Sequence, residues 1–206
     1  MGIKNFFIYI IIFSINLSGV SINNLENISF YQLENFLINK TEFNENGVKL
    51  QYNIESNKDY ELNRILGLMS DKYKIENINN KYHFYLKSNN TIEIKIWEED
   101  NITFVESFII NKNKCMSTED LKRELDNILS SKVINKKYFK YYKGEISNTD
   151  NFYIDNIELK KESLKIENGY VGKETLKNGE KLSYGIMKYN TGVYLVIGTP
   201  VIFTTY

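Results

Sequence analysis

The imidazole and thiol groups on which much enzyme and metal chemistry depends are scarce in this sequence, and they stand far apart. His83 is the only histidine and Cys115 the only cysteine. A metal site or a general base needs further ligands or an orienting partner at a defined spacing, and the sequence offers none beside either residue. We therefore interpret His83 as a residue on the face of a sheet and Cys115 as a small residue in a connection before a helix.

The acidic residues and the glycines give no clearer signal. Glu98-Glu99-Asp100 concentrates three carboxylates, but it lacks the alternating spacing of a calcium loop and is typical of a solvated hairpin turn. The glycines between positions 169 and 185 are too dispersed for a phosphate-binding loop. The sequence thus predicts no catalytic residue, no metal ligand and no cofactor.

The remaining candidates are rings on sheet faces. Residues 91–98 alternate isoleucines with other side chains, so if the isoleucines pack on helices, Trp97 projects from the opposite face together with Tyr85 of the preceding strand. Tyrosines near the C-terminus can do likewise, depending on a register that the sequence does not fix. The candidate binding residues are Trp97, Tyr85, His83, Tyr184 and Tyr194. Exposed rings flanked by polar groups suit peptide, glycan or protein partners. The competing interpretation is that a terminal segment covers this face, or that the rings pack on one another.

The elements that must position these rings follow from periodicity. Helical spacing predicts helices over 25–40 and 59–73 and a third that begins at Ser117. Alternation predicts strands, and Asn/Gly-rich segments predict turns at 44–47, 89–90, 99–101 and 178–179. The predicted strands are 48–54, 81–87, 91–98, 102–111, 138–146, 170–176, 181–189 and 193–199. A helix over about 150–165 completes the set.

The order of strand, helix and strand meander occurs twice along the chain. We therefore predict a single α+β domain over residues 22–206, built of two related halves of about 41–133 and 134–206. The mainly antiparallel sheet would carry its helices on one face.

The amino-terminal segment resembles an export signal. Met1 to Asn5 includes one lysine, residues 6–17 are almost entirely apolar, and small residues follow. Residues 1–21 therefore read as a signal peptide, with cleavage after Gly19 or Ser21. The apolar run is shorter than the roughly 20 residues of a membrane span, but an uncleaved leader would give weak membrane association.

Composition excludes one class of partner. Lysine plus arginine and aspartate plus glutamate number 26 each, so the net charge is zero. Nucleic-acid binders need a basic excess to displace counterions from phosphates, and we expect no nucleic-acid partner. A single cysteine allows no internal disulfide, so an exported chain of this kind must rely on its core.

Several short motifs resemble those of YwmB-type proteins of Gram-positive bacteria. They are Ile96-Trp97 at a strand end, Asn178-Gly179 before a tyrosine-rich strand, and Gly198-Thr199-Pro200-Val201-Ile202 with the closing Tyr206. The resemblance implies a fold like that of the TATA-box-binding protein, a curved antiparallel sheet with helices on one side and two related halves. It implies no established activity and no catalytic residues.

Together these features predict an exported cell-envelope protein that acts without catalysis as a binding or protein-interaction module. Its expected partner is an envelope protein or a glycan, captured on the free sheet face. Two alternatives remain, a small envelope hydrolase acting on peptidoglycan and a structural partner of an envelope assembly.

Overall fold

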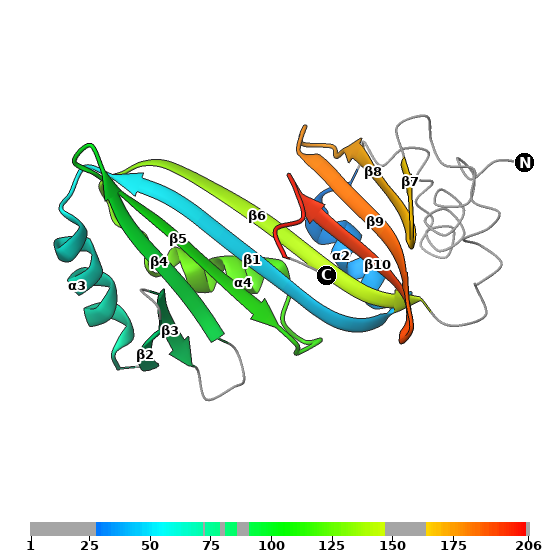
Figure 1. The fold of residues 1–206 in the computed structure, drawn as a ribbon, viewed down its shortest axis with the longest axis horizontal. Coiled ribbons are helices and arrows are strands. Elements are labelled where there is room, and N and C mark those ends of the chain that lie inside the picture. The colour runs from blue at the N-terminus through cyan, green and yellow to red at the C-terminus, as the bar shows by residue number, and fades with distance from the viewer. Residues whose placement is uncertain (1–27, 72, 79–80, 86–90, 147–163, 205–206) are drawn as a thin grey trace, which may run out of the picture. The chain divides into compact units, whose positions relative to one another are not determined.

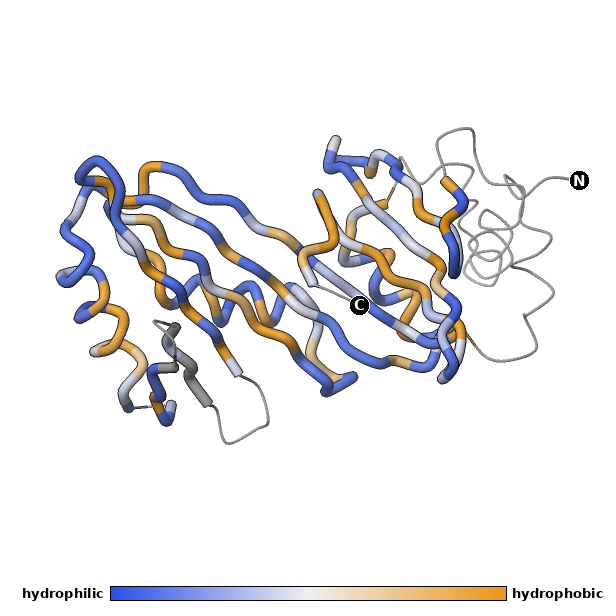
Figure 2. Tube along the Cα trace, viewed as in Figure 1, coloured by the Kyte–Doolittle hydropathy of each residue, from blue (hydrophilic) through white to orange (hydrophobic). Residues whose placement is uncertain are grey.

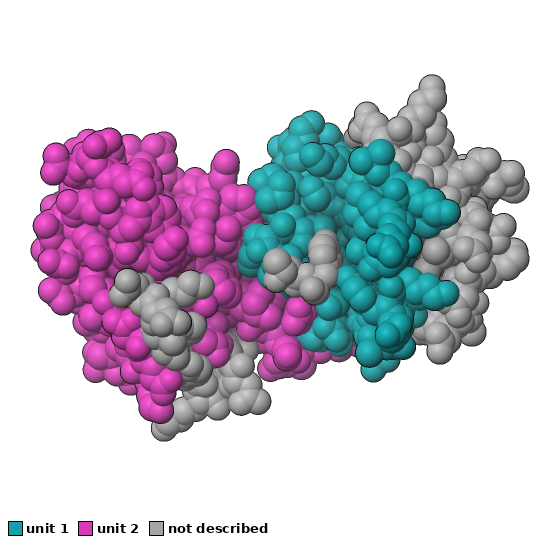
Figure 3. Space-filling model, in the orientation of Figure 1, with its two compact units in different colours: residues 1–44, 141–206 teal, residues 45–140 magenta. Residues whose placement is uncertain are grey.

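The computed structural model describes residues 28–71, 73–78, 81–85, 91–146 and 164–204. In this part of the chain three helices and ten strands form a mainly antiparallel α+β arrangement (Figure 1). The chain divides into two compact units (Figure 3). Unit 2 is the continuous segment Glu45–Lys140, and unit 1 combines residues up to Asn44 with those from Tyr141 onward. These boundaries differ from the expected junction near 133/134, because the first helix packs with the C-terminal strands.

Unit 2 contains helices α3 (Lys58–Met69) and α4 (Thr118–Asp126) and six strands in the order β2-β3-β4-β5-β1-β6. The strands are β1 (Glu42–Ile54), β2 (Lys74–Ile78), β3 (Lys81–Tyr85), β4 (Thr91–Glu99), β5 (Ile102–Asn111) and β6 (Val133–Ile146). β1 begins and β6 ends in residues that belong to unit 1.

The β4–β5 hairpin shows how alternation in sequence becomes a two-faced sheet. Along β4 the buried residues Ile92, Ile94 and Ile96 alternate with polar and partly exposed ones, and the tube in Figure 2 alternates between apolar and polar along this strand. Buried and partly exposed positions also alternate along β5. The two strands are joined at Asp100 and Asn101, whose φ angles are 50° and 62°. Asp and Asn tolerate this left-handed conformation, which a two-residue hairpin turn requires. The predicted turn at 99–101 is confirmed.

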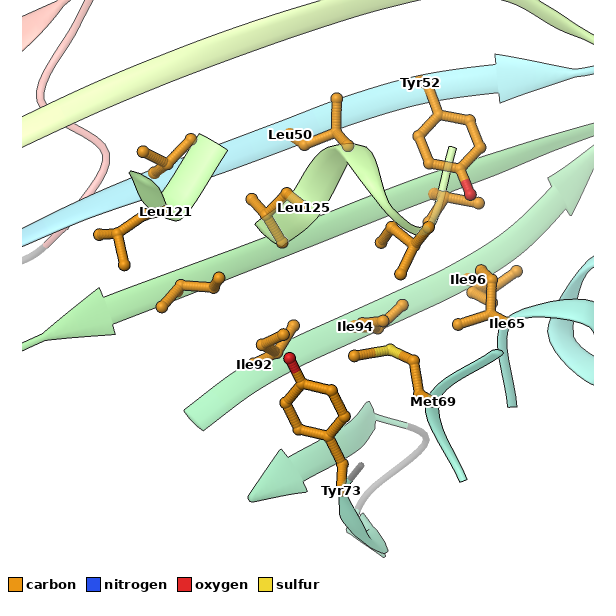
Figure 4. Close-up of a cluster of buried hydrophobic side chains, with 14 residues drawn as sticks. Leu50, Tyr52, Ile65, Met69, Tyr73, Ile92, Ile94, Ile96, Leu121 and Leu125 are labelled. Carbon is orange, nitrogen blue, oxygen red and sulfur yellow. The ribbon is translucent and has the colours of Figure 1, made fainter. Parts of the chain in front are cut away.

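The core of unit 2 lies between the sheet and its two helices. Ile94 of β4 points toward Met69 of α3, and Leu125 of α4 lies over Leu50 of β1 (Figure 4). These side chains are at most 3% exposed. Burying each one completely stabilises the fold by roughly 1.5–3 kcal/mol. The predicted packing of the β4 isoleucines on helices is confirmed.

One carboxylate is enclosed in this core. Glu61 of α3 is 0% exposed and accepts a hydrogen bond from the Tyr52 hydroxyl at 2.7 Å. The Arg64 guanidinium donates to both of its oxygens, at 2.6 and 2.8 Å, and also to the carbonyl of Ile128. Burial and the bond to Glu61 raise the pKa of Tyr52. The buried charge is thus paired and fully hydrogen-bonded, as a stable fold requires.

Residues 44–47 lie within β1 rather than in the predicted turn. Asn46 is fully buried and pairs in register with Asn111 of β5. Its side-chain amide donates to the Met116 carbonyl at 2.8 Å, and its side-chain oxygen accepts from Asn111 at 2.7 Å. Because these partners are distant in sequence, the Asn- and Gly-rich segment resembled a turn in the sequence.

Unit 1 contains helix α2 (Phe30–Ile38) and strands in the order β6-β10-β9-β8-β7. Its further strands are β7 (Leu164–Ile166), β8 (Gly169–Thr175), β9 (Lys181–Tyr189) and β10 (Gly192–Thr199). Ser29 caps α2 by accepting from the Gln32 amide at 3.3 Å, while the Gln32 side chain accepts from the Ser29 amide. Leu33 and Leu37 of the helix pack in one cluster with Leu195 of β10.

The Tyr142 hydroxyl ties β6 to the end of α2. It lies 2.8 Å from the Thr41 hydroxyl, which donates to the Leu37 carbonyl. Gly144 makes room for this pair, since a Cβ at that position would lie 2.0 Å from the Thr41 hydroxyl oxygen. A glycine is therefore required at 144 by packing.

Most predicted elements are confirmed, but the structure differs from the prediction at further points besides the turn expected at 44–47. The sequence did not predict β2 or β7, and β6 begins at Val133 instead of 138. The predicted helix over about 150–165 lies outside the described residues except for its end, which is β7. Residues 1–21 also lie outside the described part. Among the described helices, none has the length and apolar character needed to cross a membrane.

Candidate functional site

The face of the unit 2 sheet opposite its helices is the candidate site, which we call the outer face of unit 2. Its register places side chains in rows across β1, β5 and β4. One row is Asn53, Phe104 and Trp97, and the next is Gln51, Glu106 and Lys95. These side chains are partly or fully exposed, whereas their neighbours along each strand, except Glu98 beside Trp97, are buried.

Trp97 lies on this face, as predicted, and it is not an isolated ring. Its indole stacks on Phe104, with ring centroids 5.5 Å apart and an angle of 13° between the planes. The ammonium of Lys95 lies 5.0 Å from the indole centroid. Stacking contributes about 0.5–1.5 kcal/mol beyond buried area, and a cation over an exposed ring about 0.5–1 kcal/mol. The ring is thus held in a defined position while part of it stays accessible.

Glu106 is the central charge of the neighbouring row. It accepts from the Gln51 amide at 2.6 Å and pairs with Lys49 at 3.3 Å. Partial burial alone would raise the pKa of Glu106, but the Gln51 bond and the nearby lysines outweigh it and lower the pKa. The carboxylate therefore stays ionised at neutral pH, which suits a fixed electrostatic contact and not a proton-transfer role.

A second ring with cations lies on β6. Phe139 is 9% exposed, and the ammonium of Lys49 lies 5.0 Å from its centroid. Lys137 lies 5.9 Å from the same ring and is exposed. Exposed lysines next to rings therefore occur both on β4 and on β6. Such a surface presents apolar edges and positive charge together.

His83 and Tyr85 lie on the β3 backbone, in register with Glu93 and Thr91. Their side chains fall outside the described part of the chain.

The two tyrosines predicted in unit 1 do not project freely. Tyr184 lies on the helix side of β9, packed against the cluster of α2 and β10, so its expected place on the free face is wrong. The reason is register, since Tyr184 pairs with the core residue Ile197. Tyr194 does face away from α2, but it is only 8% exposed. Its ring packs 5.8 Å from Tyr189 and beneath the ammonium of Lys143 at 4.9 Å.

One acidic residue next to the β4–β5 turn makes a structural contact. Glu98 accepts from the Lys58 amide at 2.9 Å, at the start of α3. Cys115 is exposed in the loop before α4, with its amide bound to the Asn113 side chain. Nowhere in the described part of the chain do three His, Cys, Asp or Glu residues gather so that they could hold a metal ion.

Phe104, Phe139 and Lys49 belong to the site but were not singled out from the sequence. For Phe104 the signal was present, because alternation places it on the face opposite the buried Val105. Phe139 could not be found in this way. The side of β6 that faces α4 carries lysines and a tyrosine, so the sequence of this strand does not alternate between apolar and polar residues.

Compared with known proteins, the chain matches no protein-family model and no curated sequence.

Proposed function

We propose that this protein is a non-catalytic binding module of the cell envelope that captures a partner on the outer face of unit 2. The observation that carries the proposal is the Trp97–Phe104 stack with Lys95 beside it, on a sheet face that none of the described helices covers. Ordered aromatic residues with polar neighbours are the usual centres of binding energy at interfaces. Because the net charge of the chain is zero, we propose no nucleic-acid partner.

An envelope protein is the partner that this face suits best. Trp97 already stacks on Phe104, so it offers less free ring surface for a sugar than an isolated indole would. Lys95 and Lys137 are exposed and can pair with carboxylates, and Gln51 and Asn53 add amide groups beside the rings. An extended protein segment with apolar and acidic side chains uses all of these groups at once.

Crosslinking and co-purification from the native envelope would test this function. We expect the wild-type chain to retain a specific protein, and the double variant Trp97→Ala with Phe104→Ala to lose it while keeping its fold. Leu68→Ala serves as the matched control, because Leu68 is 51% exposed on α3, away from this face. Equal recovery with the double variant would refute the site, and recovery of glycan alone would refute the partner class.

We also propose that the chain is exported through its amino-terminal leader. The lysine at position 4, the apolar residues 6–17 and the small residues around Gly19 and Ser21 support this. Amino-terminal sequencing of the protein from the producing cell is the test. A mature terminus at residue 20 or 22 is expected, and a chain that retains Met1 in the cytoplasm would refute export.

We further propose that the chain consists of two related halves, as in the TATA-box-binding protein fold and as the YwmB-type resemblance implies. The halves expected from the sequence were about 41–133 and 134–206; we now propose that each half begins earlier, with helix α2 or α4, and continues through a long strand to a four-strand meander. Helices α2 and α4 are both nine residues long, and each has a serine cap with a capping box. Their caps and core leucines follow the same spacing: Ser29, Leu33, Leu37 and Asn39 in α2, and Ser117, Leu121, Leu125 and Asn127 in α4. The strand orders β2-β3-β4-β5-β1 and β7-β8-β9-β10-β6 also correspond.

A further inference from the structure

Strand β10 of unit 1 is buried on both faces. Val193, Leu195 and Ile197 face α2, as members of its core cluster. The opposite face should be open, yet Val196 on that face is 0% exposed. Every residue of β10 after Gly192 is buried, and Figure 2 shows that much of the strand is apolar. A segment other than the helix must therefore cover the second face.

The residues that follow β10 provide the cover. The chain reverses at Thr199–Pro200, and Pro200–Thr204, which we call the C-terminal segment, folds back over the outer face of unit 1. Phe203 packs edge-on against Tyr141 of β6, with ring centroids 5.8 Å apart. Ser183 of β9 donates a hydrogen bond to the Pro200 carbonyl at 3.1 Å.

Gly198 forms the hollow that admits this segment. A Cβ at Gly198 would lie 2.9 Å from both the Ile202 Cα and the Val201 carbonyl oxygen. Those contacts are with backbone, which cannot move aside as a flexible side chain would. Gly198 therefore lets the backbone of the residues three and four positions later pass directly over β10, where a side chain would block it.

The contacts that hold the segment are of the kind that a separate peptide makes. Among the described residues they include a side-chain hydrogen bond to a backbone carbonyl, a ring pair and a close backbone approach to a glycine, and Pro200–Thr204 forms no helix or strand. Val201 between them is 45% exposed. Hydrogen bonding to the backbone gives affinity, and a ring in a pocket gives specificity.

We propose that the outer face of unit 1 is a peptide-docking surface that the chain's own C-terminal segment occupies as an intramolecular ligand. The partner that this surface fits is an extended protein segment. Its backbone carbonyl would accept a hydrogen bond from Ser183, its aromatic ring would pack against Tyr141, and its backbone would pass close to Gly198. Such a partner competes with the tethered segment, so docking requires that the segment leave. This surface is distinct from the Trp97 face in unit 2 and does not depend on the function proposed for it.

A labelled synthetic peptide with the sequence of residues 199–206 tests the proposal by fluorescence anisotropy with the full-length chain. In the wild type the tethered segment competes at an effective concentration of about 1 mM, so the peptide binds weakly. Phe203→Ala weakens the docking of the chain's own C-terminal segment. We therefore expect the Phe203→Ala chain to bind the peptide about tenfold or more tightly than the wild type does. The further change Gly198→Val should abolish this gain, because its side chain blocks the hollow. Leu68→Ala in unit 2 should match the wild type.

Three results would overturn the proposal. The first is a folded Phe203→Ala chain that binds the peptide no better than the wild type. The second is that the Phe203→Ala chain still binds the peptide tightly after Gly198→Val is added to it. The third is equal binding of a peptide whose phenylalanine is replaced by alanine, since that would mean the ring is not recognised. If Phe203→Ala does not fold, Phe203→Leu carries the same comparison.

Discussion

Removing Arg64 should destabilise the protein far more than its partial exposure suggests. Arg64 is the only cation that the described structure pairs with the fully buried Glu61, which otherwise keeps one hydrogen bond, from Tyr52. In an Arg64→Met variant the side chain keeps its length and apolar stem, so little packing is lost. What remains is a carboxylate in the core without a compensating charge.

The magnitude follows from burial. Breaking a buried ion pair on one side costs about 3–5 kcal/mol, and the 22% exposure of the Arg64 side chain places this pair near 3 kcal/mol. Tyr52→Phe removes a single hydrogen bond to the carboxylate and leaves both guanidinium bonds, so about 1.5 kcal/mol is expected. Arg123→Met is the matched control, because Arg123 pairs with Asp120 at the same i,i+3 spacing with side chains 75% and 39% exposed. Its removal should cost less than about 1 kcal/mol.

Urea unfolding followed by tryptophan fluorescence measures these differences. Trp97 is the only tryptophan and lies in unit 2, so its signal reports on the unit that contains the network. The free energy of unfolding comes from linear extrapolation to zero denaturant. The double variant of Tyr52 and Arg64 should show a coupling of about 0.5 kcal/mol or more, because the two share one partner. If Arg64→Met costs no more than Arg123→Met, the buried carboxylate does not need its cation and the reasoning fails.

Three further outcomes are expected. Ser117→Ala should lower the free energy of unfolding by about 1 kcal/mol in the same urea assay, because the Ser117 hydroxyl caps α4; an unchanged midpoint would contradict the role of the cap. Gly144→Ala should lower the melting temperature markedly, since its Cβ would meet both the hydroxyl oxygen and the Cβ of Thr41, and partial recovery with Thr41→Gly, which removes both atoms, would identify the clash as the cause. Burial raises the pKa of Tyr142 to about 12, so its contribution is complete below pH 10 and is lost as pH rises toward 12; Tyr142→Phe should flatten the fall of the melting temperature over that range, and an identical fall would refute this source of alkaline sensitivity.

Local patterns predicted the elements whose partners are close in sequence. The β4–β5 hairpin was predictable because its isoleucines alternate and Asp100 and Asn101 suit its turn. The cap of α4 at Ser117 was equally visible. β2 was missed because five residues with mixed polarity give too short a pattern, and they form a strand only by pairing with β3.

The site was only partly predictable for a related reason. The face of β4 that carries Trp97 follows from period-two alternation, but its stacking on Phe104 depends on the register between strands. Tyr184 shows the reverse case, since no local pattern reveals which face of β9 meets α2. The sequence allows a terminal segment to cover a sheet face. Only the structure, through the contacts of Gly198, shows that the C-terminal segment packs on β10.

The interrupted sequence of unit 1 has a consequence for how the protein reaches its native state. Leu37 of α2 shares a core with Leu195, roughly 150 residues later in the chain, whereas every element of unit 2 comes from one uninterrupted segment. Contacts so distant in sequence slow folding, because the intervening chain must first be ordered or closed into a loop. On a ribosome α2 emerges early and exposes its apolar stripe until the last strands have been synthesised. We therefore expect unit 2 to fold first and unit 1 to fold only when the chain is complete, which leaves a long interval in which unit 1 is still unfolded.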